Sequence, residues 1–369
     1  MKKLIPRSRS IRLALFFALV SGRPGGAGAE APQDSPKPPQ DSAPAIKIVT
    51  ETTLPTELAR AADVRWAGDG AVYLAMRNQG VVEFTLGSPA ASAKKVVPGR
   101  EQLGGFWYAT LVGASERTLV AAAPAMIVTT VELATKIRRD DPVDAIHALD
   151  VRENRLLLLA MRRGEQGKVG QDGAIAWLGP SDRPFDALKP VAYDATGPGI
   201  RNMMLCGGIR MGGVRFLADG RFVVVPGVQP GAQLYDREGR LLRTWDTGAL
   251  ADSDCGTLSV EASQALNLSI EDRENWINRR RTIDTVLPLP EGPGLVVRSL
   301  EAGRLRWDLW VLKEKGAPSM HRLPIDAEGE HFHLRGDFRA GKMIFLLAEE
   351  RTKDDKYPAP RIFIALPPV

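Results

Sequence analysis

The sequence predicts an all-β chain, a six-bladed β-propeller whose blades are four-stranded antiparallel sheets. A tight turn between apolar strands recurs six times after Asp63, within residues 66–72, 114–119, 151–156, 217–222, 289–295 and 338–343. One such four-stranded unit cannot bury its own apolar face, so repeated units pack around an axis. Two further observations support a closed ring, namely one nearly complete repeat and a spare strand near the N-terminus.

The N-terminal residues predict an export signal. Basic residues between Lys2 and Arg12 precede the apolar run 13–20, and small residues at 27–29 follow, which is the pattern of a signal peptide over residues 1–29. The run is shorter than the about 20 apolar residues that span a bilayer, so we expect no membrane span. We expect an exported protein, periplasmic or secreted.

Residues 30–45 repeat the fragment Pro-Gln-Asp-Ser among further prolines and have few apolar side chains. Such a segment cannot bury enough surface to offset the entropy of ordering, so it predicts a disordered Pro-rich tether. The propeller then occupies residues 46–369.

Charge argues against nucleic acid as a partner. The chain has a formal net charge of +5, but residues 1–29 carry six basic residues and no acidic one, so the remainder is close to neutral. A near-neutral protein has no overall field that attracts phosphate backbones. We expect a monomer that binds a protein or a small molecule.

The clearest repeat spans residues 213–246, where four short apolar runs are separated by Asp-Gly and Glu-Gly turns. The same pattern places the other blades at 64–97, 107–137, 146–193, 284–323 and from 334 onward. The last blade supplies only three strands. The alternating run 46–50 is the candidate for its fourth strand, and this pairing would close the ring and remove an open sheet edge.

Two features flank the fourth repeat. The insertion 249–282 predicts a short helix, with Ser269 as its N-cap and basic residues 279–281 at its C-terminal end; a degenerate seventh blade is the alternative. Cys206 and Cys255 lie on either side of the repeat, and in an oxidising compartment a disulfide between them is expected. Two separate thiols are the alternative.

The hairpin Tyr235-Asp-Arg-Glu-Gly-Arg-Leu241 resembles the repeat of six-bladed propellers of the NHL and TolB-like kind, and the resemblance extends over about residues 63–369. It implies that the innermost strands line a channel. It also implies that loops leading into those strands share one face with loops between the second and third strands. Long loops at 161–173, 194–212, 249–282, 299–306 and 349–360 make this loop-rich face the predicted binding surface.

Arginine side chains are concentrated on that predicted face. Guanidinium groups hold carboxylates and phosphates with paired hydrogen bonds, so an anionic ligand is one interpretation. Internal ion pairing with acidic residues of the same loops is the other. The predicted binding residues are Arg77, Arg162, Arg163, Arg280 and Arg298, together with Trp276 in the inserted helix.

Histidines give one candidate metal site. His331 and His333 are separated by one residue, so on a strand both imidazoles point the same way, and His147 falls at the matching position of the opposite blade. Three nitrogen ligands suit zinc or a similar divalent ion, which could activate water. Solvated or backbone-bonded histidines are the alternative, and the sequence predicts no other cofactor.

The sequence has no Gly-x-Ser-x-Gly elbow, His-Glu-x-x-His motif, phosphate-binding loop or dinucleotide fingerprint. Lactonases of the related gluconolactonase-like group use channel carboxylates, and Asp63 and Asp284 fall on predicted channel strands, but their asparagine pattern has no match here. We therefore expect a non-catalytic binding propeller. The alternatives are a metal-assisted lactone or ester hydrolase that uses the channel, and an envelope-assembly scaffold.

Overall fold

The computed structural model describes residues 43–369, with gaps at 78, 90–91, 99–109, 124–126, 137, 143–144, 162–175, 185–186, 192–211, 226–230, 249, 251–280, 330, 350–356 and 369. The predicted signal peptide and most of the predicted tether therefore lie outside the described residues.

The described strands form six sheets of four antiparallel strands, as the sequence predicted. Blade one contains β2 (Ala61–Gly68), β3 (Ala71–Met76), β4 (Gly80–Thr85) and β5 (Lys94–Pro98). Blade two contains β6 (Leu111–Ala114), β7 (Thr118–Ala123), β8 (Ile127–Glu132) and β9 (Arg138–Pro142). Blade three contains β10 (Ala145–Arg152), β11 (Arg155–Met161), β12 (Ala176–Pro180) and β13 (Lys189–Val191).

Blade four contains β14 (Gly213–Phe216), β15 (Phe222–Val225), β16 (Ala232–Tyr235) and β17 (Leu241–Trp245). Blade five contains β18 (Thr282–Leu289), β19 (Gly292–Glu301), β20 (Arg304–Val311) and β21 (Ser319–Glu328). Blade six contains β22 (Phe332–Arg339), β23 (Lys342–Glu349), β24 (Arg361–Ala365) and the N-terminal β1 (Ile48–Thr53). A single 3-10 turn, η2 (Thr56–Leu58), leads from β1 into blade one.

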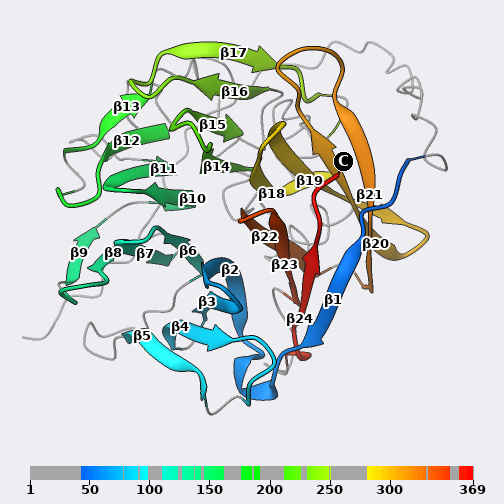
Figure 1. Ribbon diagram of the computed structural model, residues 1–369, viewed down its shortest axis with the longest axis horizontal. Coiled ribbons are helices and arrows are strands. Elements are labelled where there is room, and N and C mark those ends of the chain that lie inside the picture. Colours follow the sequence, from blue (N-terminus) through cyan, green and yellow to red (C-terminus); the bar gives the residue numbers. More distant parts are fainter. Residues whose placement is uncertain are drawn as a thin grey trace, which may run out of the picture. The chain divides into compact units, whose positions relative to one another are not determined.

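The first strand of each blade lies at the centre of the molecule. These inner strands contact one another in the order β2, β6, β10, β14, β18 and β22, and β22 contacts β2 again. Figure 1 shows the blades following one another around this centre in sequence order. The inner strands therefore surround an axial channel.

The N-terminal strand closes the ring. β1 pairs antiparallel with β24, with Glu51 opposite Phe363, and the two strands lie side by side in Figure 1. The sequence pattern predicted this pairing, but the predicted strand at 46–50 begins two residues before β1 and ends three residues before it. Because the N-terminal strand β1 pairs with β24 in the last blade, β24 does not present an open edge.

The residues at the turns explain why these strands form tight hairpins. At the end of β22, Ala340 and Gly341 have φ of 49° and 74°, the two left-handed residues of a tight hairpin turn. In blade four, the Asp219 carboxylate accepts a hydrogen bond from the Arg221 N–H at 3.0 Å. The Asp236 carboxylate does the same in the next hairpin, with the Arg240 N–H at 2.8 Å.

The core lies between neighbouring blades, and strand alternation builds it. On β23, Ile344 and Leu346 pack against blade one, whereas Phe345 and Leu347 pack against blade five. A strand with both faces buried reads as a continuous apolar run, which is why the sequence places Met343 to Ala348 in one block. Each blade is thus held by the blades beside it.

Of the predicted loops, one is a strand hairpin in the structure and another lies mostly outside the described residues. Residues 299–306 were expected to form a loop, but they continue β19 and β20 through a tight turn at Ala302 and Gly303. The insertion at 249–282 lies outside the described residues except for Leu250, Arg281 and Thr282, and Thr282 already begins β18. Within the described ranges, no helix has the length and apolar character needed to span a bilayer.

Candidate functional site at the mouth of the axial channel

Four aspartates on inner strands join neighbouring blades. Each carboxylate accepts a hydrogen bond from a backbone N–H of the next inner strand around the ring. The pairs are Asp63 with Val112 at 3.1 Å, Asp150 with Phe216 at 2.8 Å, Asp284 with Leu334 at 3.0 Å and Asp337 with Trp66 at 3.0 Å. Hydrogen bonds to ionised acceptors are stronger than neutral ones, so these carboxylates hold the ring together.

At the other two junctions a glycine allows close approach. A Cβ atom at Gly113 of β6 would lie 2.7 Å from Leu149 Cδ1 of blade three. A Cβ atom at Gly213 of β14 would lie 3.1 Å from Val286 Cγ2 of blade five. At four of the six junctions the inner strands are therefore joined by a carboxylate, and at the other two a glycine lets them approach closely.

Two buried arginines meet across the channel. Arg65 of blade one and Arg215 of blade four both donate to the carbonyl oxygen of Gly336 in blade six, at 3.5 and 3.1 Å. Arg65 also pairs with Asp63 at 2.9 Å. Burial disfavours the charged form of both arginines and so acts to lower the pKa of each. The pKa of Arg65 is nevertheless raised, mainly by Asp63, whereas the pKa of Arg215 is lowered by burial and by repulsion from Arg65.

Asp284 is the centre of a second buried network. Its carboxylate accepts hydrogen bonds from Trp307 Nε1 at 2.8 Å and Leu334 N at 3.0 Å. Arg298 Nε and His333 Nδ1 each lie 3.7 Å from its Oδ1 atom. Burial alone would raise the pKa of this carboxyl, but Arg298 and His333 hold the pKa well below its usual value.

A cavity of about 760 Å³ opens where the inner strands end. Every blade contributes to it, from Trp66 in blade one and Ser115 in blade two to Pro288 in blade five. Arg215, Asp150 and Asp337 belong to its lining, and charged residues of both signs come from the first hairpins of blades two, three and six. We call this cavity the mouth; its remaining charged residues are Glu116, Arg117, Arg152, Glu153 and Arg339.

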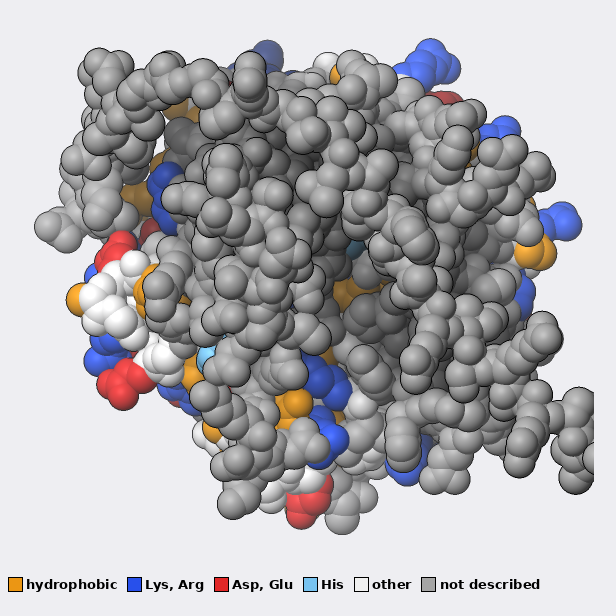
Figure 2. All heavy atoms as spheres, turned by 180° about the vertical axis from the view of Figure 1, so that it is seen from behind, with side chains coloured by type: hydrophobic (Ala, Val, Ile, Leu, Met, Phe, Trp, Pro, Cys, Tyr) orange, Lys and Arg blue, Asp and Glu red, His pale blue; other side chains and the backbone are white. Residues whose placement is uncertain are grey.

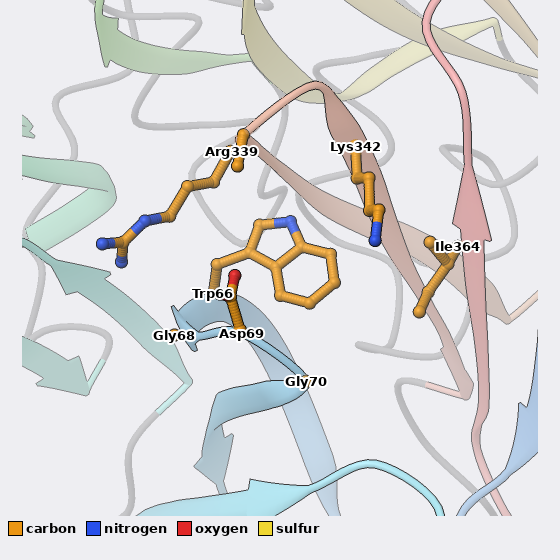
Figure 3. Close-up of a pocket in the computed structure, with 8 residues that line it drawn as sticks. Trp66, Gly68, Asp69, Gly70, Arg339, Lys342 and Ile364 are labelled. Carbon is orange, nitrogen blue, oxygen red and sulfur yellow. The ribbon is translucent and has the colours of Figure 1, made fainter.

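A second cavity of about 450 Å³ lies between blades one and six, and we call it the cleft. Trp66 and Arg339 line both the cleft and the mouth. Figure 3 shows the Trp66 indole between the hairpin that carries Arg339 and Lys342 and the turn at residues 68–70. The indole Nε1 atom is buried and has no hydrogen-bond partner among the residues that the structure describes.

The mouth lies at the C-terminal ends of the inner strands. The predicted binding surface consists of loops at the N-terminal ends of the inner strands, so the mouth lies on the opposite face. Figure 2 shows the molecule from behind, with basic and acidic side chains of described residues at the periphery of the view. Of the predicted loops, residues 162–173, 194–211, 251–280 and 350–356 lie outside the described residues.

Two of the predicted binding arginines can be placed. Arg77 follows β3, donates to the Glu349 carbonyl at 2.7 Å and lies over the Tyr357 ring, so it joins blade one to blade six. Arg298 is 1% exposed on β19 and donates to the Phe332 carbonyl at 3.2 Å. Its guanidinium is therefore buried inside the protein, whereas the sequence pattern placed this residue on a loop or at a strand end. Arg162, Arg163, Arg280 and Trp276 lie outside the described residues.

The three histidines that were predicted to bind a metal have different surroundings. His333 belongs to the Asp284 network, and His331 lies close enough to Glu349 to lower the pKa of that carboxyl, although burial raises the pKa overall. His147 is buried, its Nε2 atom has no partner within the described ranges, and burial lowers its pKa to about 4. Among the described residues, no three His, Cys, Asp or Glu side chains are grouped to hold a metal ion. Cys206 and Cys255, the predicted disulfide, lie outside the described residues.

The residues that sequence reasoning missed are Trp66, Arg215, Asp150, Asp337 and Arg339. Their signal was present but weak, because a charged residue recurs inside otherwise apolar inner strands, as in Val64-Arg65-Trp66 and Val214-Arg215-Phe216. Buried charges require partners. Asp63 is a local partner of Arg65, but the contacts with Gly336 and Phe216 join blades that are distant in sequence, so the repeat pattern alone did not reveal them.

The fold and the mouth define a six-bladed β-propeller with a charged axial cavity. No protein-family model and no curated protein matches the chain. Among solved structures, the β-propeller domain of Cps50 (Swd1) from Myceliophteria thermophila is similar, with 11% identity, coverage of 85% of this chain and 99% of that chain, and a TM-score of 0.44. The N-terminal domain of Nup159 is similar with 12% identity, coverage of 82% and 75%, and a TM-score of 0.40.

Proposed function

We propose that this protein is an exported, non-catalytic propeller that binds a protein ligand at the mouth of its channel. The observation that carries the proposal is the convergence of all six blades on one cavity of about 760 Å³ lined by charges of both signs. Concave sites at the axis of a rigid scaffold are common binding sites. The rim arginines and glutamates suit a polar segment of a partner that carries both charges.

The buried charges of the channel support a binding role over a catalytic one. Asp63, Asp150, Asp284 and Asp337 each accept a backbone hydrogen bond from a neighbouring blade. These hydrogen bonds give the four carboxylates a structural role in the ring. The hydrolase alternative would require another set of residues, and no described contact favours one.

Two finer assignments belong to the same proposal. The first is export to the periplasm or beyond, which rests on the signal pattern of residues 1–29. The second is membership of the NHL and TolB-like kind of propeller, which rests on the hairpin Tyr235–Leu241. Its Asp236 carboxylate accepts the N–H groups of Glu238 and Arg240, which gives that residue a physical role in the turn. An assembly scaffold would use the same binding activity on a partner complex.

Site-specific photo-crosslinking in the cells that make the protein tests the proposal. A benzophenone side chain at Asn154, an exposed mouth residue, should give one dominant protein adduct. The same group at Leu241, which is 51% exposed on the outer strand β17, is the control and should not give that adduct. Charge reversal by Arg117→Glu should weaken the adduct more than Arg240→Glu. Equal adducts at Asn154 and Leu241, or none at Asn154, would overturn the proposal.

A further inference from the structure

We propose that the cleft between blades one and six is a binding site for an oxyanion, a carboxylate or phosphate group carried by a small ligand. The cleft is lined by Trp66, the turn residues 68–70, the hairpin residues Arg339, Ala340 and Lys342, and Ile364. This inference goes beyond the proposed function, because six of the eight residues that line the cleft do not line the mouth, and the cleft is assigned a small molecule rather than a protein.

An unsatisfied donor points to the ligand. Trp66 is 6% exposed, and its indole Nε1 has no partner among the described residues. Figure 3 shows the ring nitrogen directed toward the hairpin that carries Arg339 and Lys342. A buried indole N–H normally finds an acceptor. The two cations of the cleft cannot accept a hydrogen bond, and the Asp69 carboxylate does not accept one from the indole in the described structure. We therefore assign the missing acceptor to a group brought by a ligand.

The two cations remain free to receive that group. No hydrogen bond or ion pair holds the Lys342 ammonium in the described structure, and Figure 3 shows it directed toward the indole. The Arg339 side chain is 44% exposed and lies 4.0 Å from Glu116, whose side chain is 88% exposed. Such an exposed pair contributes little stability, so Arg339 can turn toward an anion at low cost.

Asp69 is the opposing charge at this site. It lies on the turn across from the hairpin and is exposed, and it has no contact with Arg339 or Lys342 in the described structure. The cations outnumber it by two to one. The cleft therefore favours a monoanion or dianion on the Lys342 side, and Asp69 disfavours ligands whose negative charge extends to the turn.

The dimensions suit a small ligand with an apolar portion. A volume of about 450 Å³ lies within the range of small-molecule sites, about 300–1,000 Å³. Ile364 of β24 provides an apolar wall beside the indole. A Cβ atom added at Gly68 would meet no atom within 4 Å. Because Gly68 also lines the cleft, we expect a larger side chain at this position to be accommodated and to take up part of the cleft.

Isothermal titration calorimetry with benzoate and with phenyl phosphate tests the inference, and benzyl alcohol is the uncharged control. We expect at least one of the two anions to bind at one site, and no heat from benzyl alcohol. Comparison of the two anions assigns the site to a carboxylate or a phosphate. Added salt should weaken binding, because the attraction is partly between exposed charges.

Two variants locate the site in the cleft. Lys342→Gln and Gly68→Leu change residues that line the cleft and not the mouth. Each should weaken anion binding about tenfold or more, the loss expected for a charge-assisted hydrogen bond or for a filled cavity. Arg240→Gln, at a side chain that is 80% exposed in blade four, and Gly68→Ala are the matched controls and should bind as the wild type does.

Loss of the donor provides an independent variant. Trp66→Phe keeps an aromatic ring at the boundary of the cleft but removes the Nε1–H group, so it should weaken the anion about three- to tenfold. Unchanged melting temperature checks that each variant folds. No binding of either anion to the wild type, or equal binding to Lys342→Gln and Arg240→Gln, would overturn the inference. Crosslinking at Asn154 is independent of these results, so failure of the cleft and failure of the mouth are distinguishable.

Discussion

The Asp337 carboxylate of β22 accepts a hydrogen bond from the backbone N–H of Trp66 on β2 at 3.0 Å, across 271 positions of sequence. This contact joins the inner strand of the last blade to the inner strand of the first. It therefore closes the ring at the axis, while β1 and β24 close it at the outer side. The same contact fixes the backbone that carries the indole between the mouth and the cleft.

Removal of this carboxylate should destabilise the closed ring. We expect Asp337→Ala to lower the free energy of unfolding by about 1–2 kcal/mol, because a partly buried, charge-assisted hydrogen bond is lost. Asp337→Asn keeps a carbonyl acceptor and should cost less. Urea denaturation followed by far-UV circular dichroism measures both. A larger loss in the Asn variant than in the Ala variant would mean that the hydrogen bond is not the cause.

Asp284 should make the protein less stable below about pH 4. Burial works against its charge, but Arg298 and His333 hold its pKa below the ordinary value. Its ionised form therefore stabilises the fold above the unfolded pKa of about 3.9, and this contribution is lost as the pH falls below that value. Between pH 4.5 and 2.5 the wild type should lose on the order of 2 kcal/mol more than Asp284→Asn. Parallel pH profiles of the two proteins would contradict the network.

The sequence predicted the architecture more fully than the site. Apolar alternation and turn residues are local signals, so blade number, strand order and the closing strand could be read from them. The contacts of Arg65 and Arg215 with Gly336, and of Asp150 with Phe216, could not be predicted, because each joins residues of different blades. Arg298 shows the same limit, since its position near a turn suggested exposure, whereas β22 covers it.

His147 should give a separate pH dependence. Burial lowers its pKa to about 4, against about 6.5 in an unfolded chain. The neutral imidazole is therefore preferred in the folded state, so stability is fully present above pH 6.5 and falls as the pH decreases toward 4. The expected loss is about 2–3 kcal/mol. His147→Leu should flatten this limb and change little at pH 7.5, because Nε2 has no partner to lose. Urea midpoints between pH 7.5 and 4 measure it.

His333 should stabilise the protein without a metal ion. Its Nδ1 atom lies 3.4 Å from Arg298 Nη1 and 3.7 Å from Asp284 Oδ1. We expect His333→Ala to lower the free energy of unfolding by about 1–3 kcal/mol, by the same amount with and without EDTA. Thermal melting of wild type and variant in both buffers checks this. A chelator-sensitive melting temperature that disappears in the variant would instead favour the metal-assisted hydrolase.

Two glycine substitutions should differ in their effect on stability, because Gly113 is closely packed and Gly68 faces open space. At Gly113 a Cβ atom would lie 2.7 Å from Leu149 Cδ1, whereas at Gly68 it would meet nothing within 4 Å. Gly113→Ala forces Leu149 from its place between blades two and three, and should cost about 1–3 kcal/mol, the usual penalty of overpacking. Gly68→Ala should be neutral or stabilise the fold by up to about 1 kcal/mol, because it restricts the unfolded chain. Denaturant midpoints compare the two. Equal losses would show that the packing of blades two and three tolerates a methyl group, and that Gly113 is not required for their close approach.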